Sequence, residues 1–223
     1  MIYGWLVLLL CTTLLTFVES NTEKKIFSGK IDIISRSKKD AVDSWINEDK
    51  WNKMAPPYKM FSNQSLEFST QMASNNIQNT KWQQWYILDN LKANDVYEAR
   101  ISYAATAPTD FNLAIFDYEE LAQILRSGKR DSLLETEKDE IKVETTTKFL
   151  RVRAKYMGVS HIPGRESIPV RFNIVLETLY LGIPYQAYKL VLVIIICCVL
   201  GAFVLVPIAQ SLISQIREDK RSD

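Results

Sequence analysis

The sequence predicts a mostly β protein, with an antiparallel β-sandwich in the lumen of the secretory pathway followed by one C-terminal transmembrane α-helix. Three observations predict this arrangement: an apolar run at the N-terminus, a longer uncharged run near the C-terminus, and alternating apolar and polar residues between them. The 223 residues carry 27 basic and 26 acidic side chains, a formal net charge of +1. This balance provides no basic surface for nucleic acid, so we expect no nucleic-acid partner.

The N-terminal run is typical of a signal peptide. It extends over Leu6–Val18, a length that suits the apolar region of a signal and is short for a bilayer span. Val18 and Ser20 are small residues at the −3 and −1 positions of a cut after Ser20, which predicts a signal peptide at residues 1–20. Met1–Trp5 contains no Lys or Arg, so an uncleaved signal anchor is the alternative.

Residues 21–183 are expected to form the lumenal β-sandwich. Alternation with a period of two predicts half-buried antiparallel strands over residues 97–103, 111–115, 150–156 and 170–177. Leu91 stands six residues before Tyr97, which begins the first of these strands. This spacing resembles the tyrosine corner of Greek-key sandwiches, in which the tyrosine hydroxyl bonds to the backbone upstream.

Two segments are predicted to be helical. Asp40 is suited to cap a turn that carries apolar residues at i, i+3 and i+4, namely Val42, Trp45 and Ile46. The second helix, residues 118–126, is expected on the surface between strands, with Gly128 at its end. The polar residues 127–140 are expected to form a loop.

The C-terminal apolar run is predicted to cross a membrane. Leu190–Ala209 contains no charged residue, and at ~1.5 Å per residue it spans ~30 Å, the thickness of a bilayer core. With its flanks it occupies residues 184–212. Three basic residues in the tail, 213–223, follow the span, against Lys189 alone just before it, which favours a cytoplasmic C-terminus and a single-pass type I orientation. The link from the last strand is short, so we expect the domain to sit on the membrane surface.

Small residues recur at four-residue spacing within this span. Cys197 precedes Gly201, and Cys198 precedes Ala202, so two adjacent ridges of small side chains lie on one side of the helix. Such a face lets another helix approach closely, although a plain anchor is the alternative. Pro207 is expected to bend the helix.

The cysteines and the single sequon fit a secreted topology. Cys11 lies in the signal and the other two cysteines lie in the span, so the domain is expected to use no disulfide. Asn63-Gln64-Ser65 is the only Asn-x-Ser/Thr sequence, and Asn63 is the candidate glycosylation site.

No catalytic set is recognisable, so we expect no catalytic, cofactor-binding or metal-binding residues. His161 is the only histidine. Four acids near one predicted strand leave a glycosidase pair or a calcium site conceivable, with a solvated edge favoured: Asp110, Asp117, Glu119 and Glu120.

Two further groups of residues have both a structural and a functional interpretation. Arg151, Arg153 and Lys155 form a basic stripe, interpreted as a solvated outer face in preference to a site for lipid phosphates. Trp82, Trp85 and Tyr86 are interpreted as core packing in preference to sugar stacking.

The stretch from Trp85 to Leu113 resembles the fungal accessory subunit of GPI mannosyltransferase II. That family has a Tyr-Glu-x-Arg strand followed by Ala-Thr-x-Pro-Thr-x-Phe-x-Leu. The matching positions here include Tyr97, Glu98, Arg100, Pro108, Thr109 and Phe111. The order of signal, lumenal domain and C-terminal span is also similar, while Ser102-Tyr103 stands where the family often has Cys-Trp.

The resemblance implies a non-catalytic subunit in the endoplasmic reticulum membrane. Its implied partners are a multi-spanning catalytic mannosyltransferase subunit and membrane lipid, and the complex adds the second mannose during GPI-anchor biosynthesis. The runner-up is a single-span cargo receptor or trafficking protein of the early secretory pathway. A lumenal hydrolase is a third hypothesis and would need an acid pair between Asp110 and Glu120.

Overall fold

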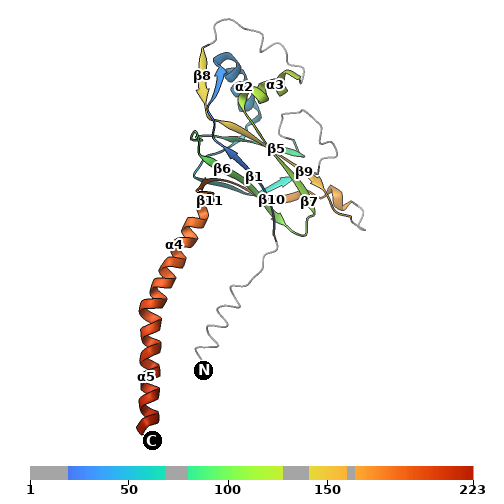
Figure 1. Cartoon of the computed structure of the whole chain (residues 1–223). Helices are drawn as coiled ribbons and strands as arrows, with labels where there is room; N and C mark the ends of the chain where they lie inside the picture. Colours follow the sequence, from blue (N-terminus) through green and yellow to red (C-terminus); the bar gives the residue numbers. More distant parts are fainter. Residues whose placement is uncertain (1–19, 69–79, 128–140, 160–163, 223) are drawn as a thin grey trace.

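The computed structural model describes residues 20–68, 80–127, 141–159 and 164–222. It confirms a mostly β domain of antiparallel sheets followed by one long apolar helix (Figure 1). The signal predicted at 1–20 lies outside the described residues except for Ser20, and so do His161, Gly128 and nearly all of the loop predicted at 127–140.

Two sheets form the sandwich. The β10 sheet has the order β1 (Ser20–Ser28), β6 (Val96–Ala104), β10 (Val170–Tyr180) and β4 (Tyr58–Leu66), with the short β11 (Ile183–Pro184) returning along the end of β10. All its pairings are antiparallel. The β9 sheet has the order β3 (Asn52–Met54), β5 (Gln83–Leu88), β9 (Lys148–Tyr156) and β7 (Thr109–Phe116), in which only β3–β5 is parallel.

The main core lies between these sheets, as the alternation of the strands predicts. On β6 the inward side chains are Tyr97, Ala99 and Ile101, all at most 1% exposed. Residues of the neighbouring strand β10 and of the facing strands β9 and β5 complete it: Ile174, Leu176, Leu150, Val152, Tyr86 and Leu88. The four predicted strands therefore correspond to β6, β7, β9 and β10.

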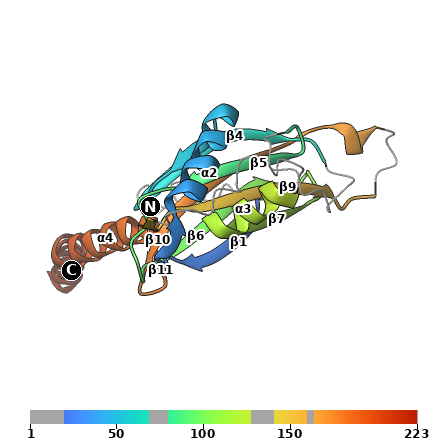
Figure 2. The ribbon, with the colours of Figure 1, turned by 90° about the horizontal axis from the view of Figure 1, so that it is seen from above.

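A second core covers the outer face of the β9 sheet. Helices α2 (Arg36–Asp49) and α3 (Tyr118–Ser127) lie across this face at the end of the domain away from the C-terminal helix (Figures 1 and 2). Its aromatic centre includes Trp51, which stacks on Trp85 with ring centroids 4.9 Å apart. A two-stranded ribbon, β2 (Asp32–Ser35) with β8 (Lys142–Thr145), borders the helices.

Both predicted helices exist, but one detail of the prediction was wrong. The Oγ of Ser35 caps α2 by accepting from the backbone N–H of Lys38, so the helix begins before Asp40. Helix α3 lies on the surface between β7 and β8, as predicted, and its apolar side packs on the β9 sheet, where Leu121 is 0% exposed.

The sequence pattern did not predict β1 and β4. Both strands lie at the edges of the β10 sheet, and most of their side chains are exposed or half-buried. An edge strand without a consistently buried face carries no apolar alternation.

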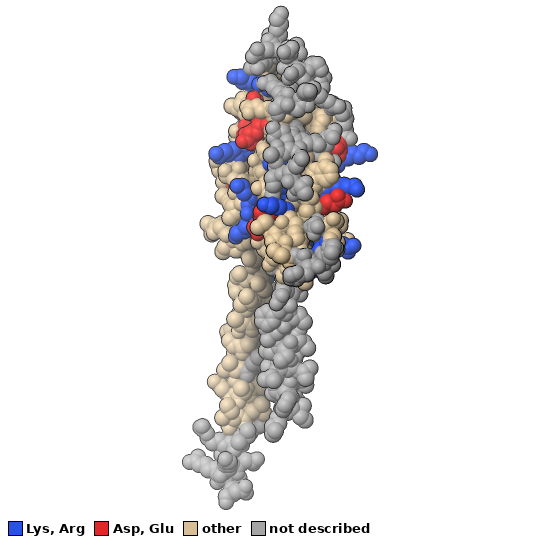
Figure 3. Space-filling view, turned by 90° about the vertical axis from the view of Figure 1, so that its right-hand side faces the viewer, with Lys and Arg blue, Asp and Glu red and all other residues tan. Residues whose placement is uncertain are grey.

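The C-terminal helix is long and apolar enough over Tyr185–Ser214 to cross a membrane. It consists of α4 (Tyr185–Leu200), a π-helical turn, η3 (Gly201–Leu205), and α5 (Val206–Ser222). Charged side chains lie over the domain, while the part of the C-terminal helix that is drawn in tan shows none in this view (Figure 3). A π turn directly precedes Pro207, where the N–H of Val206 donates to the Gly201 carbonyl, and the bend expected at Pro207 remains a prediction.

Candidate functional site

Strand β6 carries the Tyr-Glu-x-Arg motif and directs its residues to opposite faces of the β10 sheet. Tyr97 points into the core, and its hydroxyl accepts a 2.7 Å hydrogen bond from the backbone N–H of Lys92. Burial raises the pKa of Tyr97, so the hydroxyl stays neutral. Gly29 closes the corner from the other side, because a Cβ there would lie 2.1 Å from the Lys92 carbonyl oxygen. The predicted tyrosine corner is thus present.

Glu98 and Arg100 point outward and join a charge cluster, which we define as Lys24, Glu98, Arg100 and Glu177 and in which the two carboxylates are buried. Glu98 lies directly opposite Glu177 across the strands, and the two residues are 4% and 0% exposed. Such a pair of like charges is unfavourable unless cations compensate it. Arg100 Nη2 lies 2.9 Å from Glu177 Oε1, and Lys24 Nζ lies 3.5 Å from Glu98 Oε2. The charges of the cluster therefore balance.

Glu177 also connects the charge cluster to the C-terminal helix. Its Oε2 accepts a 3.4 Å hydrogen bond from the backbone N–H of Gln186, in the first turn of α4. A carboxylate at this position satisfies an otherwise unpaired N–H and complements the positive end of the helix dipole. The sequence analysis did not single out Glu177, since its partners are distant in the chain; its acidic side chain in an apolar strand was the available signal.

Two more contacts fasten the helix to the domain. Strand β11 pairs Ile183 with Tyr180 of β10, and α4 begins immediately after it. The hydroxyl of Tyr188 in α4 donates a 2.6 Å hydrogen bond to the Tyr180 carbonyl oxygen. The start of α4 is therefore fixed to the end of β10 by a strand pair, a side-chain hydrogen bond and the Glu177 cap.

The second family motif builds the turn between β6 and β7. The hydroxyl of Tyr103 donates a 2.7 Å hydrogen bond to the carbonyl oxygen of Thr109, and Thr109 Oγ1 donates to the Ala107 carbonyl. Phe111 is 5% exposed and packs between Tyr103 and Phe172. The Pro108 carbonyl accepts from the N–H of Met157. The contacts of these motif residues lie within the domain and stabilise the turn.

The four acidic residues lie at two different places in the domain. Asp117 and Glu120 form a reciprocal cap at the start of α3, with N–H to carboxylate distances of 3.0 and 2.8 Å. Asp110 lies at the opposite end of β7, so the four acids do not gather at one strand end as expected. Among the described residues, no group of three His, Cys, Asp or Glu is placed to hold a metal ion.

The interpretation of the basic stripe as a solvated face was wrong for two of its three residues. Arg153 is 4% exposed and donates from Nε and Nη2 to Gln83 Oε1. Arg151 lies over the rings of Trp85 and Phe116, and burial together with the Arg153 charge lowers its pKa to about 10. Only Lys155 is exposed.

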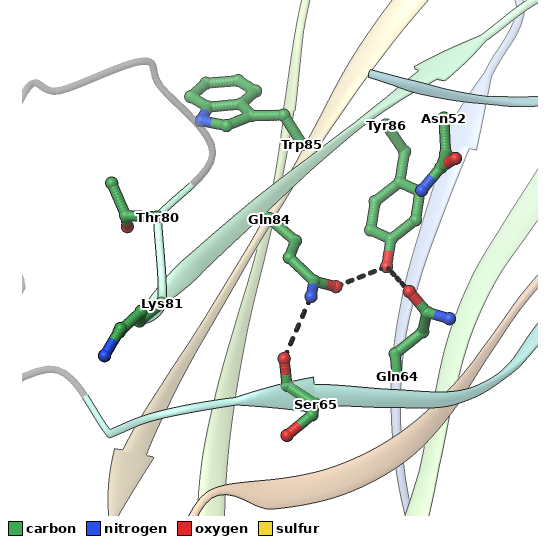
Figure 4. A pocket seen from close by; sticks show the side chains of 8 residues that line it. All are labelled: Asn52, Gln64, Ser65, Thr80, Lys81, Gln84, Trp85 and Tyr86. Carbon is green, nitrogen blue, oxygen red and sulfur yellow. Dashed lines mark hydrogen bonds between the residues drawn. The ribbon is translucent and has the colours of Figure 1, made fainter. Parts of the chain in front are cut away.

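A groove of about 560 Å³ opens where the edges of β4 and β5 meet (Figure 4). Its lining residues are Asn52, Gln64, Ser65, Thr80, Lys81, Gln84, Trp85 and Tyr86. The Tyr86 hydroxyl donates to Gln84 Oε1 at 2.7 Å, and Gln84 Nε2 donates to the Ser65 carbonyl at 3.0 Å. Trp85 and Tyr86 are each 1% exposed, in agreement with core packing, whereas Trp82 is 46% exposed. The groove's polar side chains thus join the two sheets.

Asn63 lies beside this groove on an exposed edge. Its φ of 54° and the break in pairing between Phe172 and Ile174 mark a bulge in β4. Its side chain is exposed, and its backbone N–H donates to Asn173 Oδ1 at 2.9 Å. Glycosylation of Asn63 remains a prediction.

The small residues of the helix form an open surface in the structure. Cys197, Cys198 and Ala202 are exposed, and a Cβ added at Gly201 would meet no atom within 4 Å. Docking of a second helix on this face remains a prediction.

A family comparison covers most of the chain. The model of the Pga1 family, described as the GPI-mannosyltransferase II co-activator, matches residues 11–208. No curated protein and no solved structure matches the chain. A co-activator assists a catalytic mannosyltransferase, so the family confirms the non-catalytic accessory subunit expected from the sequence, and nothing supports the trafficking alternative. The chain, with its β-sandwich and its apolar C-terminal helix, belongs to the Pga1 family of GPI-mannosyltransferase II co-activators.

Proposed function

We propose that this co-activator is a single-pass type I protein of the endoplasmic reticulum membrane that binds a multi-spanning catalytic subunit and supports addition of the second mannose to the GPI precursor. The family supplies the general role. The observation that carries the finer proposal is the attachment of α4 to β10 through Glu177, Tyr180 and Tyr188. This attachment holds the domain at the membrane surface, within reach of a membrane-embedded enzyme.

The start of the folded domain supports the proposed boundaries. Strand β1 begins at Ser20, beside the proposed cleavage after that residue, and pairs along β6 from Ala104 onward. With a signal at 1–20, a lumenal domain at 21–183, a span with flanks at 184–212 and a tail at 213–223, processing would remove only Ser20 from the sandwich.

Protease protection tests the orientation. Protease added to sealed microsomes should remove only the short tail, and glycosidase should shift the protected band by one glycan. Asn63→Gln should abolish that shift, because the exposed bulge carries the only sequon. Digestion of the domain with protection of the tail would invert the topology.

Substitutions on the helix test the proposed docking surface. Gly201→Ile or Ala202→Ile keeps the span apolar but fills the small-residue face, so each should weaken co-purification with the catalytic subunit in mild detergent. Val199→Ile is the matched control, since at about 100° per residue its side chain points away from the middle of the ridges. Full activity of a chimera with an unrelated apolar span would assign recognition to the domain alone.

A further inference from the structure

The β10–β11 hairpin presents apolar side chains beside the start of α4. Leu181 at its tip is 98% exposed, and Tyr180 and Ile183 are 45% and 43% exposed. The sequence from Tyr180 to Tyr188 contains no charged residue. A single exposed apolar residue is ordinary, but here three neighbouring apolar side chains are exposed together, as at sites that contact a membrane or another protein.

The backbone of the tip does not favour leucine. Leu181 and Gly182 have φ values of 53° and 79°, as in the two-residue turns that prefer Asn-Gly. A leucine side chain in the left-handed region is strained, whereas asparagine tolerates it. Neither the backbone conformation nor contact with water accounts for leucine at position 181.

The position of the hairpin tip relative to the bilayer is set by the attachment of the hairpin to α4. Tyr180 lies between two tyrosines of the helix, with ring centroids 6.5 Å from Tyr185 and 6.2 Å from Tyr188. The uncharged run begins at Leu190, so at ~1.5 Å per residue Tyr185 lies ~7 Å above the hydrocarbon boundary. This is the depth of the lipid head groups, where tyrosine is enriched. Figure 1 shows β11 at the edge of the domain from which α4 leaves.

We propose that the β10–β11 hairpin is a second membrane contact, with Leu181 and Ile183 inserted among the head groups and upper acyl chains of the leaflet that α4 enters. The inference rests on the membrane span in the proposed function. It gives the domain two points of contact with the bilayer, the helix and the hairpin, which together restrict its tilt relative to the membrane.

An environment-sensitive fluorophore on the hairpin tests this proposal. The sequence has no cysteine between Cys11 and Cys197, so Leu181→Cys in a Cys197→Ala, Cys198→Ala background gives one labelling site in the processed chain. The full chain is labelled with nitrobenzoxadiazole and reconstituted in phosphatidylcholine vesicles containing lipids with a doxyl quencher at a shallow or a deep acyl position. We expect blue-shifted emission, quenched more strongly by the shallow probe.

Three further labels make the result decisive. Ile183→Cys reports on the hairpin if position 181 does not tolerate change, and Ile33→Cys, 65% exposed at the other end of the domain, should remain aqueous and unquenched. The native Cys198 reports the span itself. Deep quenching at Cys198 with aqueous emission at 181 and 183 would overturn the hairpin contact and leave the span intact. Aqueous emission at all positions would overturn the span. A blue shift only after addition of the catalytic subunit would assign the hairpin to protein.

Discussion

The outer faces of the two sheets are covered in different ways. On the β9 sheet, α2 and α3 bury a cluster of aromatic rings around Trp51, Trp85 and Phe149. On the β10 sheet, two carboxylates are buried and paired with basic residues, and the first turn of α4 reaches one of them. The first face is closed by apolar packing within the domain, whereas the second uses polar groups to hold the C-terminal helix.

We infer that the packing on the β9 sheet mainly stabilises the domain, whereas the charges on the β10 sheet mainly fix the position of α4. Apolar packing is non-directional and stabilises roughly in proportion to the area buried. Buried ion pairs contribute little net stability, but they fix the groups that they join and are costly to break. Substitutions on the β9 face should therefore unfold the domain, and substitutions on the β10 face should loosen the helix first.

The largest effect is expected from Phe149→Ala. Phe149 is 0% exposed, and its ring lies 4.8 Å from Tyr118 and 6.0 Å from Trp51. The cavity should lower the free energy of unfolding by about 3–5 kcal/mol, measured by denaturation of the full chain in detergent. Trp82→Ala removes a half-exposed aromatic residue and is the control. Equal losses for both variants would contradict the second core.

Glu177→Ala should cost about 2 kcal/mol, less than a fully buried pair because Arg100 remains 30% exposed. Loss of the cap should also increase hydrogen exchange at the Gln186 amide in the full chain. Glu177→Gln keeps an acceptor for that amide and should restore its protection. Glu144→Ala, at an exposed position, should change neither measurement. Unchanged exchange in Glu177→Ala would show that the carboxylate does not cap α4.

Tyr97→Phe should cost about 1 kcal/mol, because the Lys92 N–H loses its acceptor. Tyr58→Phe should have a smaller effect, because the Tyr58 hydroxyl is exposed and donates a weak 3.5 Å hydrogen bond to the Met60 sulfur. Identical unfolding midpoints for Tyr97→Phe and the unaltered chain would mean that the corner hydrogen bond contributes nothing.

The smallest effect on mannosyl transfer is expected from substitutions of the acidic residues and the histidine that were considered as catalytic candidates. Alanine at Asp110, Asp117, Glu119, Glu120 or His161 should leave mannosyl transfer in microsomes unchanged at equal protein abundance. Asp117→Ala should lower stability by about 1 kcal/mol through the lost cap. A loss of transfer by any stable variant would revive the enzyme hypothesis.

Local patterns predicted the central part of the fold. Strands with one buried face, such as β6 and β9, show alternation, and the Leu91–Tyr97 spacing reveals its corner because both ends of the hydrogen bond are close in sequence. Edge strands β1 and β4 bury only a few of their side chains, such as Leu66, so they show no apolar alternation and were not predicted. The charge cluster joins β1, β6 and β10, and no single segment carries its pattern. Arg153 was assigned to solvent because its partner Gln83 is distant in the chain.

The π turn at Gly201–Leu205 changes the direction in which the side chains of the C-terminal helix point. A hydrogen bond from Val206 back to Gly201 adds one residue to that turn, so every side chain beyond it is rotated by about 100° from the line that a regular α-helix would follow. The ridges that begin at Cys197 and Cys198 therefore stop at Gly201 and Ala202. A helix docked along these ridges, as proposed above, would lose contact with them beyond Ala202, because the side chains of α5 point in a different direction from those of α4.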